Sequence, residues 1–262
     1  MRALDTAATG MAAQDLKVQV IAGNIANMGT TGFKSQRAEF QDLIYEHVQR
    51  IGAQASENGN ILPVGIEIGS GVKTVGTPRL MVQGSFAQTG NTLDVAIQGS
   101  GWFKILMPDG TFSYTRDGSF QMDNQGRIVT AEGNLVQPTI TIPPNSTGLT
   151  INQQGQISVT LPGSTSSTIL GQFTLTTFIN DAGLQANGDN LFVATPASGN
   201  PQDGTPGING AGTLLQGSLE QSNVEAVTEI SNLISAQRAY EMNSKVITAA
   251  DQMLQTTAQL MR

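Results

Sequence analysis

The stretch at residues 222–254, SNVEAVTEISNLISAQRAYEMNSKVITAADQML, decides the fold. Large side chains recur in it every seven residues, at Leu233, Tyr240, Ile247 and Leu254, and the series continues to Met261. This spacing predicts an α-helix with one apolar seam. Ser222 and Glu225 have the spacing of a capping box, in which the two side chains accept the first free amides of a helix. We therefore predict a helix of about 40 residues and roughly 60 Å that follows Ser222.

A second seam occupies the N-terminal end of the chain. It repeats every seven residues at Leu4, Met11, Val18 and Ile25. Gln14 is a polar interruption in it, and Gly29 and Gly32 supply a helix-ending break. Two arrangements fit such a pair of helices. Both can pack on a shared globular core, or they can form a coiled coil, within the chain or between chains.

Between the two helices the chain has the pattern of an antiparallel β domain. Apolar and polar residues alternate over short runs, and turn residues separate the runs. The predicted strands include 103–105, 112–114, 120–122, 140–142, 157–159 and 173–175. A four-residue turn ending in glycine recurs at 123–126, 152–155 and 180–183, and each copy is expected to close a hairpin. The predicted fold class is α+β, with long N- and C-terminal helices forming a coiled-coil-like inner domain and a central antiparallel β-rich domain.

The charges exclude several classes of partner. The 262 residues carry 20 acidic and 13 basic side chains, and neither Lys nor Arg occurs between Ile128 and Gln237. A nucleic-acid binder needs clustered cations, so we expect no nucleic-acid partner. No run of 18 apolar residues occurs, so we expect no membrane insertion. The start of the chain lacks the apolar core of a secretory signal, because Asp5 and Asp15 interrupt it.

Side chains suited to catalysis are scarce. His47 is the single histidine and cysteine is absent, so a nucleophile and base could be built only around His47. We expect His47 on a solvated helix or loop surface. The glycine clusters at 69–74 and 99–101 lack the spacing of phosphate-binding and dinucleotide-binding loops. No run of acids has the pattern of a calcium loop. We expect no enzyme, no cofactor and no metal.

Three parts of the sequence resemble a known family. They are residues 22–34 (AGNIANMGTTGFK), residues 94–103 (DVAIQGSGWF) with 114–120 (YTRDGSF), and residues 222–225 (SNVE) with 237–241 (QRAYE). In the same order, they resemble the N-terminal signature, the start of the β domain and the C-terminal helix of the bacterial flagellar axial proteins, the rod and hook subunits. Trp102 departs from the pattern, since Phe is more usual there.

Within this family, residues 36–45 and 62–72 look like those of distal rod subunits. The resemblance implies a structural subunit exported by the flagellar type III apparatus without a cleaved signal. It implies helical assembly with copies of itself into the rigid shaft that crosses the periplasm and carries torque to the hook. Its neighbours would be proximal rod proteins, the hook or a hook-side junction, and the surrounding L and P ring proteins. The alternatives are a proximal rod or hook subunit, or a secreted β-rich binding module such as an adhesin.

We expect two groups of residues to serve assembly. The helical seams comprise Leu4, Met11, Val18, Ile25, Leu233, Tyr240, Ile247, Leu254 and Met261. A rod-specific segment, expected to pack between neighbouring subunits, contains Ile61, Leu62, Pro63, Gly65 and Ile66. The expected domains are residues 1–33 with 222–262 as the inner helical domain, 34–71 as an extended linker, and 72–221 as the outer β domain.

Overall fold

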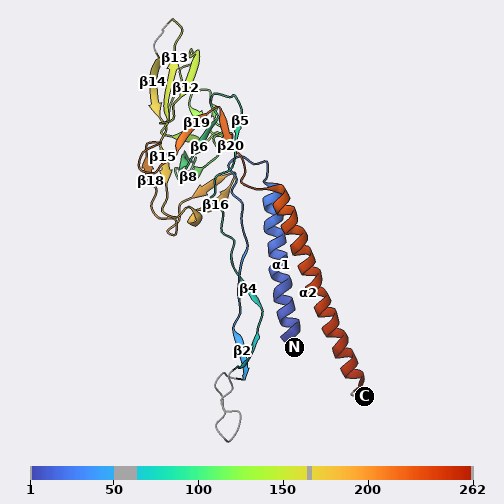
Figure 1. Ribbon diagram of the computed structural model, residues 1–262. Helices are drawn as coiled ribbons and strands as arrows, with labels where there is room; N and C mark the ends of the chain where they lie inside the picture. The colour runs from blue at the N-terminus through green and yellow to red at the C-terminus, as the bar shows by residue number, and fades with distance from the viewer. Residues whose placement is uncertain (1, 50–63, 164–166, 261–262) are drawn as a thin grey trace. The chain divides into compact units, whose positions relative to one another are not determined.

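A computed structural model of the chain describes residues 2–49, 64–163 and 167–260 (Figure 1). The chain divides into two compact units. Unit 1 comprises Met1–Ile25, Gln36–Pro78 and Glu225–Arg262, and unit 2 comprises Ala26–Ser35 and Arg79–Val224. Much of the segment expected to be a linker therefore belongs to the unit that holds the helices.

Two long helices pack against each other in unit 1. α1 spans Arg2–Ala26 and α2 spans Ala226–Leu260. They run antiparallel, because Gly10 lies against Asn243 whereas Val18 shares a hollow with Tyr240 (Figure 1). Within the described residues, neither helix combines the length and the apolar character that a membrane-spanning helix needs. Of the arrangements left open by the pattern, pairing within the chain is the one observed.

The predicted capping box is wrong, since α2 begins only at Ala226. The carbonyl of Glu225 accepts the first hydrogen bond of the helix, from the amide of Glu229 at 3.0 Å. Ser222 Oγ instead accepts the amide of Val224 at 3.3 Å, which closes a local turn before the helix. The reason is tertiary, because the main chain at residue 223 is held by a hydrogen bond to the segment that follows α1.

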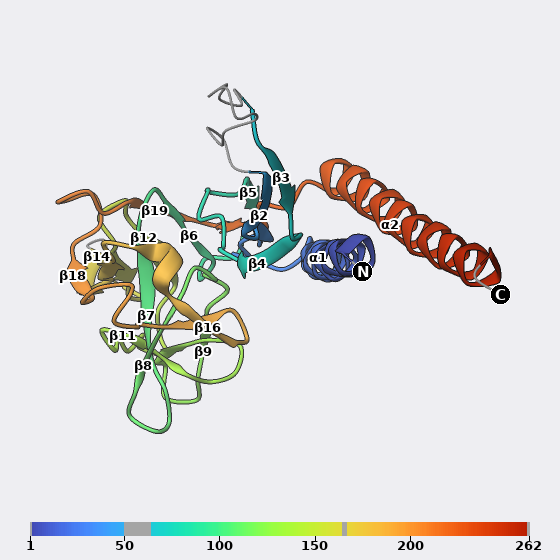
Figure 2. The ribbon, with the colours of Figure 1, turned by 90° about the horizontal axis from the view of Figure 1, so that it is seen from below.

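Unit 1 also contains two antiparallel ribbons. β1 (Glu39–Asp42) pairs with β4 (Val72–Gly76), and β2 (Tyr45–Gln49) pairs with β3 (Ile66–Gly69). β4 lies beside α1, where the amide of Val72 donates to Thr9 Oγ1 at 3.3 Å (Figure 2). Gly71 permits this close approach, because a Cβ there would lie 2.3 Å from the same hydroxyl. The β1–β4 ribbon is thus anchored on α1.

Unit 2 is an antiparallel β structure built around β7 (Trp102–Leu106). Nine described strands form its largest sheet, in which β7 pairs with β8, β11 and β15. The members besides β7 are β8 (Phe112–Thr115), β9 (Gln121–Met122), β10 (Ile128–Val129), β11 (Leu135–Gln137), β15 (Leu175–Thr177), β16 (Gln185–Gly188), β17 (Leu191–Val193) and β18 (Gln202–Gly204).

Smaller groups of strands complete unit 2. β12 (Gly148–Ile151), β13 (Gln156–Thr160) and β14 (Ser167–Gln172) form a three-stranded sheet. Two further pairs are β6 (Val95–Gln98) with β19 (Thr213–Gln216), and β5 (Phe86–Gln88) with β20 (Ser218–Glu220). Phe103, Phe120 and Phe173 meet in the core, with the rings of Phe103 and Phe120 edge to face at 4.9 Å between centroids. Such a ring pair contributes about 0.5–1.5 kcal/mol beyond the area that it buries.

The predicted strand at residues 140–142 is wrong. Thr141 forms one isolated bridge to Arg127, and the amide of Ile142 donates to the carbonyl of Gly126 at 2.7 Å. Ile140 and Ile142 are nevertheless buried, as the alternation predicted. The pattern therefore reported which side chains face the core, but this segment lies against a turn and has no continuous strand partner.

Two of the three predicted hairpin turns are confirmed. Residues 123–126 join β9 to β10, residues 152–155 join β12 to β13, and the final glycine of each turn has a φ of +80°. Residues 180–183 close no hairpin, because β15 and β16 on either side pair with other strands. They contain a single 3-10 turn, η1 (Asp181–Gly183). Glycine is needed there for space, since a Cβ would come within 2.7 Å of the carbonyl of Ala197.

Candidate assembly surfaces and a buried ion cluster

Most of the residues in the predicted helical seams are partly covered in unit 1. Side chains that are partly covered in this unit are Leu4, Met11, Val18, Ile25, Leu233, Ile247 and Leu254. Tyr240 keeps 44% of its surface exposed, and Met261 lies outside the described residues. Small residues bring the helices close: Ala236 and Ala250 are buried, and a Cβ at Gly10 would lie 2.9 Å from the Asn243 amide.

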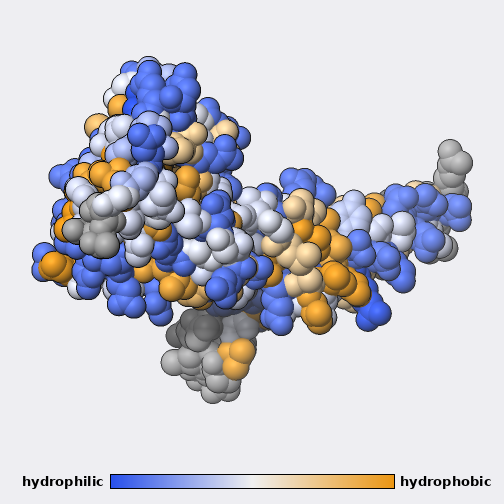
Figure 3. Space-filling view, turned by 90° about the horizontal axis from the view of Figure 1, so that it is seen from above, coloured by the Kyte–Doolittle hydropathy of each residue, from blue (hydrophilic) through white to orange (hydrophobic). Residues whose placement is uncertain are grey.

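The side of α2 that faces away from α1 is also apolar. At about 100° per residue, three of the exposed apolar residues lie opposite the face that contains Ala236, Asn243 and Ala250, and three lie on its flank. Val227, Ile230 and Ile234 lie opposite it, and Met242, Val246 and Met253 lie on the flank. Val227 is 77% exposed and Ile230 is 49% exposed, and apolar side chains gather on the helical part of the molecule in Figure 3. A helix that is apolar on two opposite sides is built to be covered on both.

The β2–β3 ribbon exposes apolar side chains as well. All five residues of β2 are exposed, and so are the first three of β3. Its large apolar residues are Tyr45, Val48, Ile66 and Ile68. Of the rod-specific segment, Ile66 is exposed and Gly65 is half-buried, while Ile61, Leu62 and Pro63 lie outside the described residues. A two-stranded ribbon with no covering layer is only marginally stable in water.

His47 lies on β2, on an exposed strand and not on the helix or loop surface that we expected. Its Nδ1 is 3.0 Å from Glu67 Oε1 on β3, and both side chains are exposed. This arrangement offers no nucleophile and no closed pocket. Within residues 2–49, 64–163 and 167–260, no three or more His, Asp or Glu side chains are grouped so that they could hold a metal ion.

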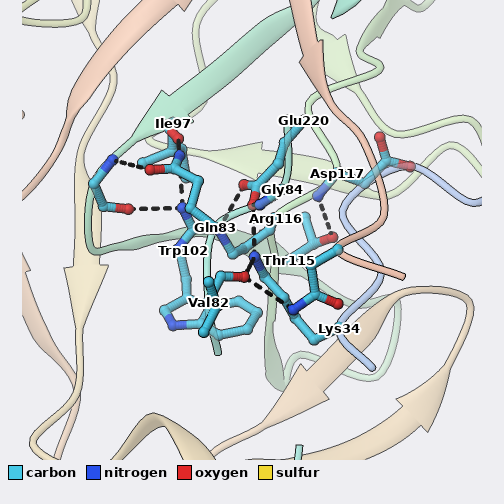
Figure 4. Close-up of polar contacts among 12 residues, drawn as sticks. Lys34, Val82, Gln83, Gly84, Ile97, Trp102, Thr115, Arg116, Asp117 and Glu220 are labelled. Atoms are coloured by element: carbon cyan, nitrogen blue, oxygen red, sulfur yellow. Dashed lines mark hydrogen bonds and ion pairs between the residues drawn. The ribbon is translucent and has the colours of Figure 1, made fainter. Parts of the chain in front are cut away.

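Unit 2 contains a buried ion cluster that the sequence analysis missed (Figure 4). Both carboxylate oxygens of Glu220 are used: Oε1 is 2.5 Å from Lys34 Nζ, and Oε2 is 2.9 Å from Arg116 Nε. The amide of Gly84 also donates to Oε1, at 3.0 Å. The side chains of Lys34 and Glu220 are at most 1% exposed, and that of Arg116 is 5% exposed.

Backbone carbonyls accept further hydrogen bonds from the two cations. Lys34 Nζ donates to the carbonyl of Val82 at 2.8 Å, and an Arg116 amine donates to that of Gly99 at 2.7 Å. Burial, and then the nearby Arg116 charge, lower the pKa of Lys34 below its ordinary value, although the Glu220 contact works in the opposite direction. Because the cluster is closed to solvent, it serves structure and not chemistry. Removing one partner of such a buried pair costs about 3–5 kcal/mol.

Trp102 borders this cluster. Its contacts explain why a Trp can stand at a position where Phe is more usual. The Arg116 guanidinium lies 5.8 Å from the centre of the indole ring, and the ring N–H donates to Asp181 Oδ1 at 3.1 Å. A buried Trp needs a partner for its N–H, and here η1 supplies one.

Comparison with known proteins assigns the three regions of the chain. Residues 4–34 match the flagella basal body rod protein family, residues 96–159 match the flagellar hook protein FlgE/F/G D1 domain, and residues 215–260 match the flagellar basal body rod FlgEFG protein C-terminal family. The flagellar basal-body rod protein FlgG of Caulobacter vibrioides is 55% identical over 99% of both chains. The chain belongs to the FlgG family. FlgG of Agrobacterium fabrum is 49% identical over 97% of both chains, and FlgG of Borreliella burgdorferi is 48% identical over 97% of this chain and 96% of its own.

Membership of the FlgG family confirms the predicted structural, non-enzymatic role in the flagellar basal-body rod. Each matched region supplies one member of the ion cluster: Lys34 from the first, Arg116 from the second and Glu220 from the third. Lys34 and Arg116 lie in residues 22–34 and 114–120, two of the stretches that resemble the flagellar axial proteins. The sequence pointed less clearly to Glu220 as a member of an ion pair, since it is one of several acids in a segment without Lys or Arg. The cluster joins the three FlgG regions at one point.

Proposed function

We propose that this FlgG-family chain is a distal rod subunit that assembles helically with copies of itself into the rigid shaft that carries torque to the hook. In this proposal the helical seams form the inner layer, and residues 72–221 form the outer layer. The inner layer contains residues 1–33 and 222–262, and residues 34–71 link the two layers.

The observation that carries this proposal is the second apolar face of α2. One face is covered by α1, whereas Val227, Ile230 and Ile234 on the opposite face remain exposed. Full burial of such a side chain contributes about 1.5–3 kcal/mol. In a helical polymer every copy presents the same face to a neighbour, so the whole row is covered at once.

The β2–β3 ribbon supports a wedge between neighbouring subunits. Its apolar side chains Tyr45, Val48, Ile66 and Ile68 are exposed to water, which is unfavourable unless a partner covers them. We propose that these residues, with Ile61, Leu62, Pro63 and Gly65, pack between copies and resist their sliding. Stiffness would follow, because a wedge removes the freedom of neighbours to shift along one another.

The remaining partners are proposed from the family. Proximal rod proteins would meet one end of the shaft and the hook or a hook-side junction the other, with the L and P ring proteins around it. Export would use the flagellar type III apparatus without a cleaved signal. Residues 133–180 contain no Asp, Glu, Lys or Arg, and a surface without fixed charges can turn inside a ring without breaking ion pairs.

The test is a charge placed on the exposed face of α2. Ile234→Asp should leave the isolated chain folded, because this side chain is already 45% exposed. The variant should nevertheless fail to form filaments or to restore swimming, since a carboxylate would enter a covered interface. Ser244→Asp, on the same helix, adds the same charge at an exposed polar position and is the control. Normal filaments and swimming with Ile234→Asp would refute the proposed interface.

A further inference from the structure

Three segments of unit 2 meet around the side chain of Asn223. Its Oδ1 accepts the amide of Ser35 at 2.7 Å, and its Nδ2 donates to the carbonyls of Leu80 at 2.8 Å and Val82 at 3.0 Å. Its backbone amide donates to the carbonyl of Phe33 at 3.4 Å. One amide side chain therefore uses its acceptor and both of its donors to join three distant parts of the sequence.

Further bonds join the same segments. The amide of Leu80 donates to the carbonyl of Ser35, and the amide of Gly32 donates to the carbonyl of Glu220, both at 2.8 Å. The Lys34 ammonium contacts both Val82 and Glu220, so the ion cluster is continuous with these bonds (Figure 4). We call residues 32–35, 79–84 and 218–223 the junction.

The junction lies where the chain leaves unit 2 toward the helices. α1 ends at Ala26, shortly before Gly32, and α2 begins at Ala226, shortly after Asn223. The segments that lead to the two helices are therefore fixed to each other inside unit 2. The bonds of the junction come from unit 2 alone, whereas α1 and α2 leave apolar surface uncovered.

We propose that the junction is already formed in the unassembled chain and is a positioning device for assembly: it anchors α1 and α2 at adjacent points so that they pair within one subunit. Two segments held by short connections meet at a high effective concentration, on the order of millimolar. Pairing within the chain then precedes pairing with the helices of other copies, which prevents misassembly at the growing end. Asn223 and Glu220 are positioning residues in this scheme.

The first test is hydrogen exchange of the full chain as a dilute monomer, which does not depend on assembly and so is separate from the proposed function. We expect the amides of Gly32, Ser35 and Leu80 to be protected like those of β7, while the amides of α1 and α2 exchange fast. Fast exchange at these three amides, with β7 still protected, would overturn the proposal.

The second test replaces Asn223 by Asp, which keeps the shape and removes the two donors to Leu80 and Val82. Asn124→Asp, at an exposed turn position, makes the same change of charge and is the control. We expect exchange at Ser35 and Leu80 to become at least about tenfold faster with Asn223→Asp and to stay unchanged with the control. The fluorescence of Trp102, the single tryptophan, should stay as in the parent and so report an intact β body.

A positioning role predicts one more effect, which a purely stabilising role does not. The chain contains no cysteine, so Gly10→Cys with Asn243→Cys would create a single thiol pair across the helix seam. In dilute monomer the intramolecular disulfide should form at least about fivefold more slowly when Asn223→Asp is added. An unchanged cross-linking rate would refute the positioning role, even if exchange at the junction became faster.

Discussion

Unit 2 has a buried core of large aromatic side chains, whereas the helices and ribbon of unit 1 expose many of their large apolar side chains. Unit 2 buries Trp102, Phe103, Phe120 and Phe173 and pairs its buried Lys34, Arg116 and Glu220 with one another. Unit 1 leaves apolar residues exposed on the outer side of α2 and along β2 and β3. Its helices are long, but each is covered on only part of its circumference.

This difference separates a part that is complete within one chain from a part that is completed by assembly. Ordering a residue costs about 1–2 kcal/mol of backbone entropy, and apolar burial must offset it. In unit 2 the apolar burial within its own core offsets this entropy. In the helices of unit 1, burial offsets this entropy only when other copies of the chain cover their second face. We therefore expect α1 and α2 to be sensitive to protease in dilute monomer, while the β body resists.

The largest effect should come from opening the ion cluster. Glu220→Gln leaves Lys34 and Arg116 buried without their carboxylate, so the free energy of unfolding of the β body should fall by about 3–5 kcal/mol. Denaturant unfolding followed by Trp102 fluorescence measures it. Asp189→Asn, at an exposed position with a φ of +51° that asparagine tolerates, should change stability by less than about 0.5 kcal/mol. If Glu220→Gln and Asp189→Asn were equally stable, the buried ion cluster would not be what makes unit 2 complete within one chain.

A change in the seam of unit 1 should spare unit 2. Leu254→Asp places a charge in a partly covered position near the end of α2. We expect loss of filaments and of swimming, with unfolding of the β body unchanged. Gln259→Asp, at an exposed position of the same helix, should swim normally. If Leu254→Asp supported normal swimming, the seam would have no part in assembly.

Removing residues 49–63 should change stiffness and not folding. We expect a subunit that folds and polymerises into filaments that bend more easily, because the proposed wedge between copies is gone. Bending stiffness is measured from filament images. Replacing the same residues by a glycine-serine segment of equal length separates the loss of apolar anchors from the loss of length. If filaments of the deletion variant were as straight as those of the parent, residues 49–63 would have no part in stiffness.

The smallest effect concerns acid. Burial alone would raise the pKa of Asp203, but hydrogen bonds from Lys104 at 2.7 Å and from Thr176 outweigh it and hold this pKa below its usual value. The unfolded chain then binds the proton more tightly, so the contribution of Asp203 is present above about pH 4 and is lost as pH falls through the lower folded value. Asp203→Asn should destabilise the body by less than about 1 kcal/mol at pH 6.

The loss caused by Asp203→Asn should shrink toward pH 3, and urea unfolding of the β body at both pH values measures the change. Asp189→Asn again serves as the control. A loss as large at pH 3 as at pH 6 would mean that packing, and not the charge of Asp203, supplies the stabilisation.

The sequence by itself determined what depends on near neighbours along the chain. The heptads of 222–254 predicted α2, because side chains seven residues apart lie on one side of a helix. Glycine at 126 and 155 predicted two hairpins, because those positions need a positive φ. The alternation at 140–142 predicted burial correctly for the same local reason.

Tertiary structure decided what depends on which distant segments meet. Lys34 and Glu220 are 186 positions apart, and nothing local marks either as the partner of the other. The turn at 180–183 has the residues of a hairpin but joins strands with different partners. Ser222 and Glu225 have the spacing of a cap, yet the hydrogen bonds of Asn223 hold that segment outside the helix. In the last two cases a local preference of about 1 kcal/mol yielded to several long-range contacts that form together.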